Sequence, residues 1–179
     1  MSIFSNSHIS IASAGDIIAI KDLLNSAYRG EASKKGWTTE AHLIAGEKRT
    51  DEASLKEVMQ QLGSVFLKYT DEASKIIACV NLQQHGYKIY LGMFSVSPQL
   101  QGGGVGKQML QAADEYAMHL QCTSIYMSVI SVRTELIDWY QRHGYHHTGE
   151  VKPFIEDDVT GKHLQQLEFL ILEKTLNKD

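Results

Sequence analysis

LGMFSVSPQLQGGGVGKQML, residues 91–110, joins a strand-like run to a glycine-rich segment and the start of a helix. The apolar run ends before Pro98, because proline has no N–H to give to a sheet ladder. After the glycines, apolar residues recur at helical spacing from Val105 to Leu120. The first N–H groups of a helix lack partners within the helix and lie at the positive end of its dipole. The stretch therefore predicts a strand, a loop and a helix N-terminus that binds an anion such as phosphate.

Spacing distinguishes three kinds of phosphate-binding loop in this segment. A nucleotide triphosphatase P-loop requires Gly, four residues and Gly-Lys-Ser/Thr, but Gln101 replaces the first Gly and Gln108 replaces the hydroxyl residue. A dinucleotide fingerprint requires Gly-x-Gly-x-x-Gly, and its last position is not glycine in either possible register. The pattern Gln/Arg-x-x-Gly-x-Gly/Ala does fit, through Gln101, Gly104 and Gly106.

A second pattern lies downstream, where WYQRHGY (residues 139–145) follows a strand-like run at 125–130. In this order and context, the two patterns resemble the GNAT superfamily of N-acetyltransferases. The glycine segment is similar to the family's acetyl-coenzyme A pyrophosphate loop, and Tyr140 to Tyr145 is similar to its Tyr-x-x-x-Gly-Phe/Tyr signature. The resemblance runs from about residue 8 to the C-terminus, and it implies acetyl-coenzyme A as cosubstrate.

Composition limits the classes of protein that this chain can represent. A chain of 179 residues fits one domain, which we expect to span residues 1–179. With 17 basic and 21 acidic residues and no dense basic run, the chain has a net charge of -4, which argues against nucleic acid as a partner. The cysteines Cys79 and Cys122 lie in or beside apolar runs, so we expect buried thiols and a reducing compartment. No apolar run approaches the ~20 residues of a membrane span, and we expect a cytoplasmic protein without a membrane partner.

Upstream of the glycine segment, apolar spacing predicts a strand near residues 8–13 and two helices. The first helix starts after Asp16, which can cap it, and its apolar face consists of Ile17, Ile20, Leu24 and Ala27. The second helix has its apolar face at Leu55, Val58, Met59 and Leu62, and it ends at Gly63. Between these helices, residues 30–49 show no clear period, which indicates a functional loop with one helical turn.

The remaining pattern predicts a mixed α/β (α+β) domain. Strand-like runs occur at 65–70, 76–82, 87–96, 125–130, 145–150 and 164–172, and a further helix at 133–143. Short turns between the first three runs favour antiparallel hairpins, whereas the long helical crossover from Val96 to Ile125 requires parallel neighbours. We therefore expect a central, mostly antiparallel sheet with one parallel strand pair, flanked by helices. The GNAT resemblance implies that this pair is splayed.

The resemblance also implies where acetyl-coenzyme A binds. In family members, backbone N–H groups of the strand before the loop bind pantetheine and polarise the acetyl carbonyl, like an oxyanion hole. Here Phe94 and Val96 stand at those positions, and Arg133 stands where relatives commonly have an asparagine and could contact the coenzyme. The phosphates would rest on the loop that Gln101 holds in place, which consists of Gly102, Gly103, Gly104, Val105, Gly106 and Lys107.

Tyr140 is the residue that the resemblance implies as the general acid, because family members often place this hydroxyl near the sulfur. A phenol of pKa ~10 is protonated at neutral pH, and it can protonate a nearby thiolate whose conjugate acid has a pKa of ~8.5.

The general base and the acceptor site are less clearly indicated. Many relatives carry a glutamate on the strand before the loop, but residues 90–93 contain no carboxylate. By family topology, Glu40 and His42 border the acceptor pocket and are candidates for the base and for substrate binding, with a water chain as the alternative. Trp37 either walls the same pocket or packs the loop onto the core.

Taken together, the motifs and the resemblance that they carry imply an acetyl-coenzyme A-dependent N-acetyltransferase that modifies a primary amine of a small molecule or peptide by direct attack in a ternary complex. The alternative is a non-catalytic, acyl-coenzyme A-binding GNAT-like sensor or assembly module, which the missing strand glutamate keeps open. We expect no metal, because His143, His146 and His147 lack the spacing of a ligand set. A homodimer is compatible with the resemblance, since relatives often pair through sheet edges.

Overall fold

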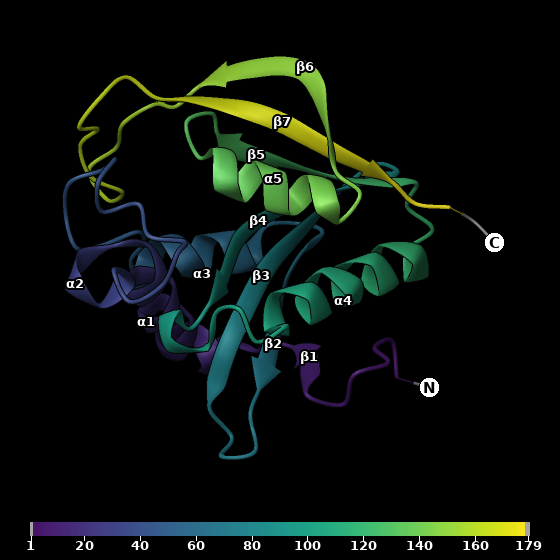
Figure 1. The fold of residues 1–179 in the computed structure, drawn as a ribbon. Helices are drawn as coiled ribbons and strands as arrows, with labels where there is room; N and C mark the ends of the chain where they lie inside the picture. The colour runs from purple at the N-terminus through teal and green to yellow at the C-terminus, as the bar shows by residue number, and fades with distance from the viewer. Residues whose placement is uncertain (1, 178–179) are drawn as a thin grey trace.

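The computed structural model describes residues 2–177, in which seven strands form one sheet in the order β1-β2-β3-β4-β5-β7-β6 (Figure 1). The strands are β1 (Ile9–Ile11), β2 (Ser64–Thr70), β3 (Ile76–His85), β4 (Lys88–Val96), β5 (Ser124–Ile130), β6 (His146–Pro153) and β7 (Glu168–Thr175). All neighbouring strands are antiparallel except β4 and β5, which are parallel. The predicted mixed sheet with one parallel pair is confirmed.

Helices cover both faces of this sheet. They are α1 (Ile17–Tyr28), α2 (Gly30–Ser33), α3 (Glu52–Gln60), α4 (Val105–His119) and α5 (Thr134–Arg142), with short 3-10 turns η1 (Ala14–Asp16) and η2 (Pro98–Leu100). The helices α1 and α3 lie on one face, and α4 lies across the other (Figure 1). As predicted, α1 begins after Asp16 and buries an apolar face.

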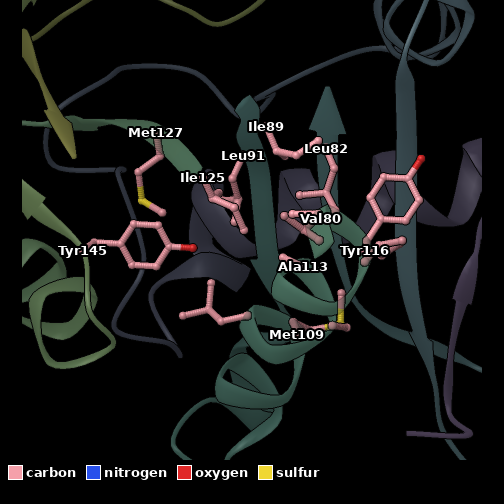
Figure 2. Packing of buried hydrophobic residues seen from close by; sticks show 14 of the residues in the cluster. Val80, Leu82, Ile89, Leu91, Met109, Ala113, Tyr116, Ile125, Met127 and Tyr145 are labelled. Carbon is pink, nitrogen blue, oxygen red and sulfur yellow. The ribbon is translucent and has the colours of Figure 1, made fainter. Parts of the chain in front are cut away.

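Alternate residues of the central strands feed two separate cores. Phe66 and Cys79 pack with α1 and α3, whereas Leu67 and Val80 pack with α4, because successive strand side chains point to opposite faces. Figure 2 shows the α4 side of the sheet, where buried side chains of the helix and of the central strands meet. Both cysteines are buried and free, and burial raises the pKa of each thiol.

The parallel pair separates soon after it forms. Pairing between β4 and β5 covers only Lys88–Tyr90 against Ser124–Tyr126. Beyond that point the register of β3 against β4 shifts between Cys79 and Asn81, and Met93 opposite has a φ of 48°. A bulge of this kind bends its strand, so the second half of β4 diverges from β5. The splayed strand pair implied by the resemblance is present.

Two expected elements differ from the structure. The helix α3 ends at Gln60, so the expectation that Leu62 lies on its apolar face was wrong, and this side chain is 98% exposed. The last strand begins at Glu168 instead of residue 164, because Leu164 N–H donates to Leu43 O, in the loop between α2 and α3, and not to the sheet. In the part of the chain that the structure describes, no helix is long and apolar enough to cross a bilayer.

Candidate functional site

The glycine segment forms a bare turn at the start of α4. Gly102 and Gly104 have φ values of 88° and 87°, which only glycine adopts without strain. Gly104 is the N-cap of α4, and no side chain caps the helix. The first helical bond runs from Gln108 N–H to Gly104 O. The N–H groups of Val105, Gly106 and Lys107 therefore have no partner within the helix, as an anion site requires.

A pocket of about 610 Å³, here called the loop pocket, opens beside this turn. It brings together most of the residues predicted to bind the coenzyme. One part of its wall consists of Gly102, Gly104, Gly106 and Lys107 of the loop region, Phe94 to Val96 of β4, and Tyr28, Trp37, Thr38 and Gln101. The other part consists of Glu135, Leu136, Trp139, Tyr140 and Arg142 of α5, and of His143 directly after it. Gly103 and Val105 belong to the turn but do not line the pocket.

Gln101 links three segments at the edge of the loop pocket. Its Oε1 accepts hydrogen bonds from Trp37 N–H at 2.8 Å and Thr38 N–H at 3.3 Å. Its Nε2 donates to Thr38 Oγ1 at 2.7 Å and to Val96 O at 3.0 Å. A Cβ at Gly36 would collide with the Gln101 carboxamide. Gln101 thus ties the glycine turn to β4 and to the loop after α2.

The backbone of β4 presents polar groups to the gap left by the splay. Ser97 N–H donates to Ile77 O at 2.8 Å. Because residues of an antiparallel strand alternate between facing a partner and facing away, Val96 directs its N–H away from β3. The carbonyl of Phe94 accepts a hydrogen bond from the Tyr28 hydroxyl, which connects the end of α1 to the bulged part of β4.

Tyr140 lies where α5 meets this gap. The residue is 5% exposed, and its ring packs against Phe94, Trp139 and Tyr145. Burial raises the pKa of the Tyr140 phenol well above its ordinary value, and the nearby Tyr28 raises it further. The hydroxyl is therefore protonated throughout the physiological range, as a proton donor must be.

A smaller cavity of about 100 Å³, here called the splay pocket, lies between the diverging strands. It is bounded by residues 90–94 of β4, 127–130 of β5, Tyr28, Glu40, Arg49, Arg133, Leu136, Tyr140, Phe154 and Phe169. It shares Tyr28, Phe94, Leu136 and Tyr140 with the loop pocket. The two pockets therefore adjoin at these four residues, Tyr140 among them.

Charged side chains are concentrated around the splay pocket. Glu40 is 8% exposed, and its Oε2 lies 2.6 Å from Nη1 of Arg29. Its Oε1 lies 3.6 Å from Nη1 of Arg133. Arg29 also donates from Nη2 to Thr160 O at 3.0 Å. Both Glu40 oxygens thus face guanidinium groups, and the carboxylate is part of a buried charge cluster.

Other predicted site residues lie elsewhere than expected. Arg133 was expected to contact the coenzyme, but it lines the splay pocket and not the loop pocket. Trp37 lines the loop pocket, with its ring centre 6.2 Å from that of Trp139, and it does not line the splay pocket. His42 is exposed and lines neither pocket. The positions of these residues along the chain did not indicate which of the two pockets each side chain faces.

Sequence reasoning missed Tyr28, Arg29 and Arg49, although each contributes to the site. Tyr28 lines both pockets, Arg29 forms an ion pair with Glu40, and the Arg49 guanidinium lies 5.9 Å from the centre of the Tyr28 ring. One signal was available, since Tyr28 and Arg29 stand where the apolar period of α1 stops and the aperiodic loop starts. Bulky polar residues at such a boundary are typical of a site wall.

Comparison with known proteins adds independent information. The model of the Acetyltransferase (GNAT) family matches residues 18–145. A spermine/spermidine N(1)-acetyltransferase of Bacillus subtilis (strain 168) is 34% identical over 65 residues, which are 36% of this chain and 43% of that protein. The match thus spans less than half of that relative.

Solved structures share the fold over nearly the whole chain. An N-acetyltransferase from Staphylococcus aureus Mu50 superposes with a TM-score of 0.70 at 17% identity, covering 97% of this chain and 100% of that one. The ribosomal-protein-S18-alanine N-acetyltransferase from Escherichia coli gives 0.69 at 14% identity, with 96% and 94% covered. A phosphinothricin acetyltransferase from Sinorhizobium meliloti in complex with AcCoA gives 0.69 at 15% identity, with 94% and 88% covered. At these identities the likeness shows the fold alone.

Proposed function

Because this chain belongs to the GNAT acetyltransferase family, we propose that it transfers an acetyl group from acetyl-coenzyme A to a primary amine by direct attack in a ternary complex. The observation that carries the proposal is the meeting of the two pockets at Tyr140. The loop pocket is suited to the coenzyme and the splay pocket to the amine. A thioester at their junction would lie within reach of both the amine and the phenol.

The residues of the loop pocket fit a coenzyme diphosphate. The free N–H groups of Val105, Gly106 and Lys107 lie at the positive end of the α4 dipole. The positive φ values of Gly102 and Gly104 keep side chains out of the turn. Lys107 adds a positive charge to the pocket wall. The bound coenzyme would supply the thioester, and Val96 N–H would orient its pantetheine arm.

Tyr140 acts as the general acid in this proposal. The amine nitrogen forms a bond to the acetyl carbon, the carbon–sulfur bond breaks, the departing thiolate takes the phenol proton, and the phenolate takes a proton from solvent to complete the cycle. Burial raises the pKa of Tyr140, but burial raises the pKa of a thiol as well, as it does for Cys79. Burial therefore shifts the two proton affinities in the same direction, which limits the cost of the proton transfer.

Proton removal from the amine does not require a dedicated carboxylate here. Both Glu40 oxygens are engaged with arginines, so we assign Glu40 to positioning Arg133 and infer that water carries the amine proton to solvent. The nearby positive charges of Arg133 and Arg49 favour the neutral amine, because they disfavour a like charge on the ammonium group.

The experiment that tests this function follows coenzyme A thiol release with a panel of primary amines, alongside acetyl-coenzyme A binding by calorimetry. Binding and thiol release above the hydrolysis background are expected. Binding without release on any amine would favour the second candidate, a non-catalytic acyl-coenzyme A-binding module. The absence of a carboxylate on β4 facing the splay pocket is the observation that supports this alternative.

The cellular location, the kind of acceptor and the oligomeric state are also proposals. The free buried thiols of Cys79 and Cys122 support a reducing, cytoplasmic location. The acceptor belongs either to a small molecule or to a peptide, and the exposed strand β6 at one edge of the sheet offers a surface for a homodimer.

A further inference from the structure

The splay pocket has more positive charge around it than its one lining carboxylate balances. Arg49 and Arg133 line it, Arg29 lies behind Glu40, and Glu40 is the single acidic residue of its wall. Building on the acetyltransferase function proposed above, we propose that the acceptor is a compact amine with a carboxylate a few bonds from its nitrogen. Arg133 binds that carboxylate in this arrangement.

Arg133 is the residue with unused binding capacity. Its side chain is 2% exposed, and within residues 2–177 its Nε and Nη2 atoms are buried without a hydrogen-bond partner. Its Nη1 lies 3.6 Å from Glu40 Oε1, beyond a good hydrogen bond. Buried charged donors without acceptors are costly, whereas a carboxylate can accept two parallel N–H bonds from one guanidinium. A ligand carboxylate is the group that completes this site.

The surrounding acidic side chains do not neutralise the positive charge of Arg133 and Arg49. Arg29 and Glu40 form a close pair at 2.6 Å and neutralise each other. Glu135 Oε1 lies 3.7 Å from Arg133 Nε, but its side chain is 56% exposed and belongs to the loop pocket, so water screens its charge. Asp157, whose pKa Arg49 helps to lower, is exposed as well. The positive charges of Arg133 and Arg49 remain for a ligand.

The same charges disfavour a polyamine in this pocket. A polyamine carries several ammonium groups, and like charges at close range in a poorly solvated site repel strongly. The pocket is also small, about 100 Å³, with Tyr90, Phe154 and Phe169 among its walls. The acceptor would therefore differ from spermine and spermidine. The matched segment covers only 43% of the spermine/spermidine N(1)-acetyltransferase.

Matched pairs of amines on the unmodified protein test the proposal. Lysine is compared with cadaverine, phenylalanine with phenethylamine, and spermidine serves as the polyamine. Each is assayed for thiol release with acetyl-coenzyme A and, separately, for binding to the complex with coenzyme A by calorimetry. The carboxylated member of at least one pair should bind ~10–100-fold more tightly than its partner, because it makes charge-assisted hydrogen bonds. Equal or tighter binding of the decarboxylated amine or of spermidine, or no selective binding of any carboxylated amine, would overturn it.

Variants assign the effect to Arg133. Arg133→Gln should remove the preference within the pair by weakening binding of the carboxylated amine to the level of its partner, with acetyl-coenzyme A affinity nearly unchanged. Arg133→Lys should restore part of the preference for the carboxylated amine, since lysine keeps the positive charge but cannot form two parallel bonds to a carboxylate. Lys56→Gln, which removes one exposed charge on α3, is the control. If Arg133→Gln is unstable, Arg133→Lys carries the test, because loss of the paired geometry alone should weaken the preference.

Two readouts separate this proposal from the function on which it rests. Thiol release reports on acetyl transfer, and selectivity in the binding assay reports on carboxylate recognition. Selective binding without release would leave carboxylate recognition standing and contradict catalysis. Release with spermidine, but without any carboxylate preference, would support catalysis and contradict carboxylate recognition.

Discussion

The hydroxyl of Tyr28, the last residue of α1, donates a hydrogen bond to the backbone carbonyl of Phe94 in the bulged half of β4. This bond joins two residues that are 66 positions apart in the sequence, and it fixes the strand that borders both pockets. The bond holds β4 where it diverges from β5, and so keeps the gap between the two strands open. Loss of this hydrogen bond should therefore affect both stability and turnover.

Tyr28→Phe should lower the free energy of unfolding by about 1 kcal/mol, because it removes the donor and leaves a carbonyl without its partner. It should also reduce kcat, since Phe94 lies where the two pockets meet. Urea denaturation and steady-state kinetics measure the two effects. Tyr87→Phe is the matched control, because that ring is 77% exposed. Equal stability of the two variants would contradict a structural role for the bond.

The same tyrosine predicts a pH effect. Burial and the charge of Glu40 raise the pKa of Tyr28 to about 12, above its value of ~10 in an unfolded chain. A group whose pKa rises on folding stabilises the fold fully below the unfolded value, and this stabilisation is lost as pH rises through the folded value. Between pH ~10 and ~12, the protein should therefore lose more stability than Tyr28→Phe does. Parallel pH slopes for the two proteins would contradict this assignment.

Tyr140→Phe should lower kcat by about 10²–10⁴-fold, the usual contribution of a general acid. The dissociation constant of acetyl-coenzyme A should change little, because the ring that packs against Phe94 and Trp139 is kept. Single-turnover thiol release and calorimetry separate the two quantities. An unaltered rate in this variant would remove Tyr140 from the mechanism.

Gly104→Trp should weaken acetyl-coenzyme A binding by at least ~100-fold, because the indole would occupy the turn where several charge-assisted bonds to phosphate are expected. Gly149→Trp is a matched control. Gly149 has a φ of 92°, against 87° for Gly104, and a Cβ at either position meets no atom within 4 Å. Both variants therefore carry similar backbone strain. If circular dichroism shows both folded and both bind the coenzyme normally, the assignment of the turn is wrong.

Gln101→Ala should weaken acetyl-coenzyme A binding by roughly tenfold, because the turn loses the bonds that preorganise it. Gly36→Ala should have a similar effect, since the new methyl group displaces the Gln101 carboxamide. Calorimetry on the double variant should show effects that do not add, as expected for residues in contact. Gly15→Ala is the control, because its Cβ would meet only Ser13 Oγ at 3.7 Å. Fully additive losses would show that the two residues act separately.

Most of the elements and the glycine turn before α4 were predictable because they follow from local rules. Apolar spacing located α1 and α4, and the glycines after Gln101 marked the turn between β4 and α4. The exposed Leu62 shows the limit of such rules. Its spacing continued the apolar face of α3, but the helix had already ended at Gln60.

The acceptor side could not be predicted in the same way. Glu40 looked like a candidate base when its neighbours in the chain alone were considered, yet Arg29 and Arg133 enclose its carboxylate in the folded protein. Arg133 was predicted to contact the coenzyme, and only the folded structure shows that it lines the splay pocket.

For this protein, most helix and strand positions and the glycine turn before α4 were properties of the chain itself, because each depends on residues within a few positions of one another. The charges around the splay pocket were settled only by folding, which packs the loop after α1 against the start of α5. Side-chain direction and burial decide which guanidinium pairs closely with a carboxylate and which does not. Neither property follows from local spacing in the sequence.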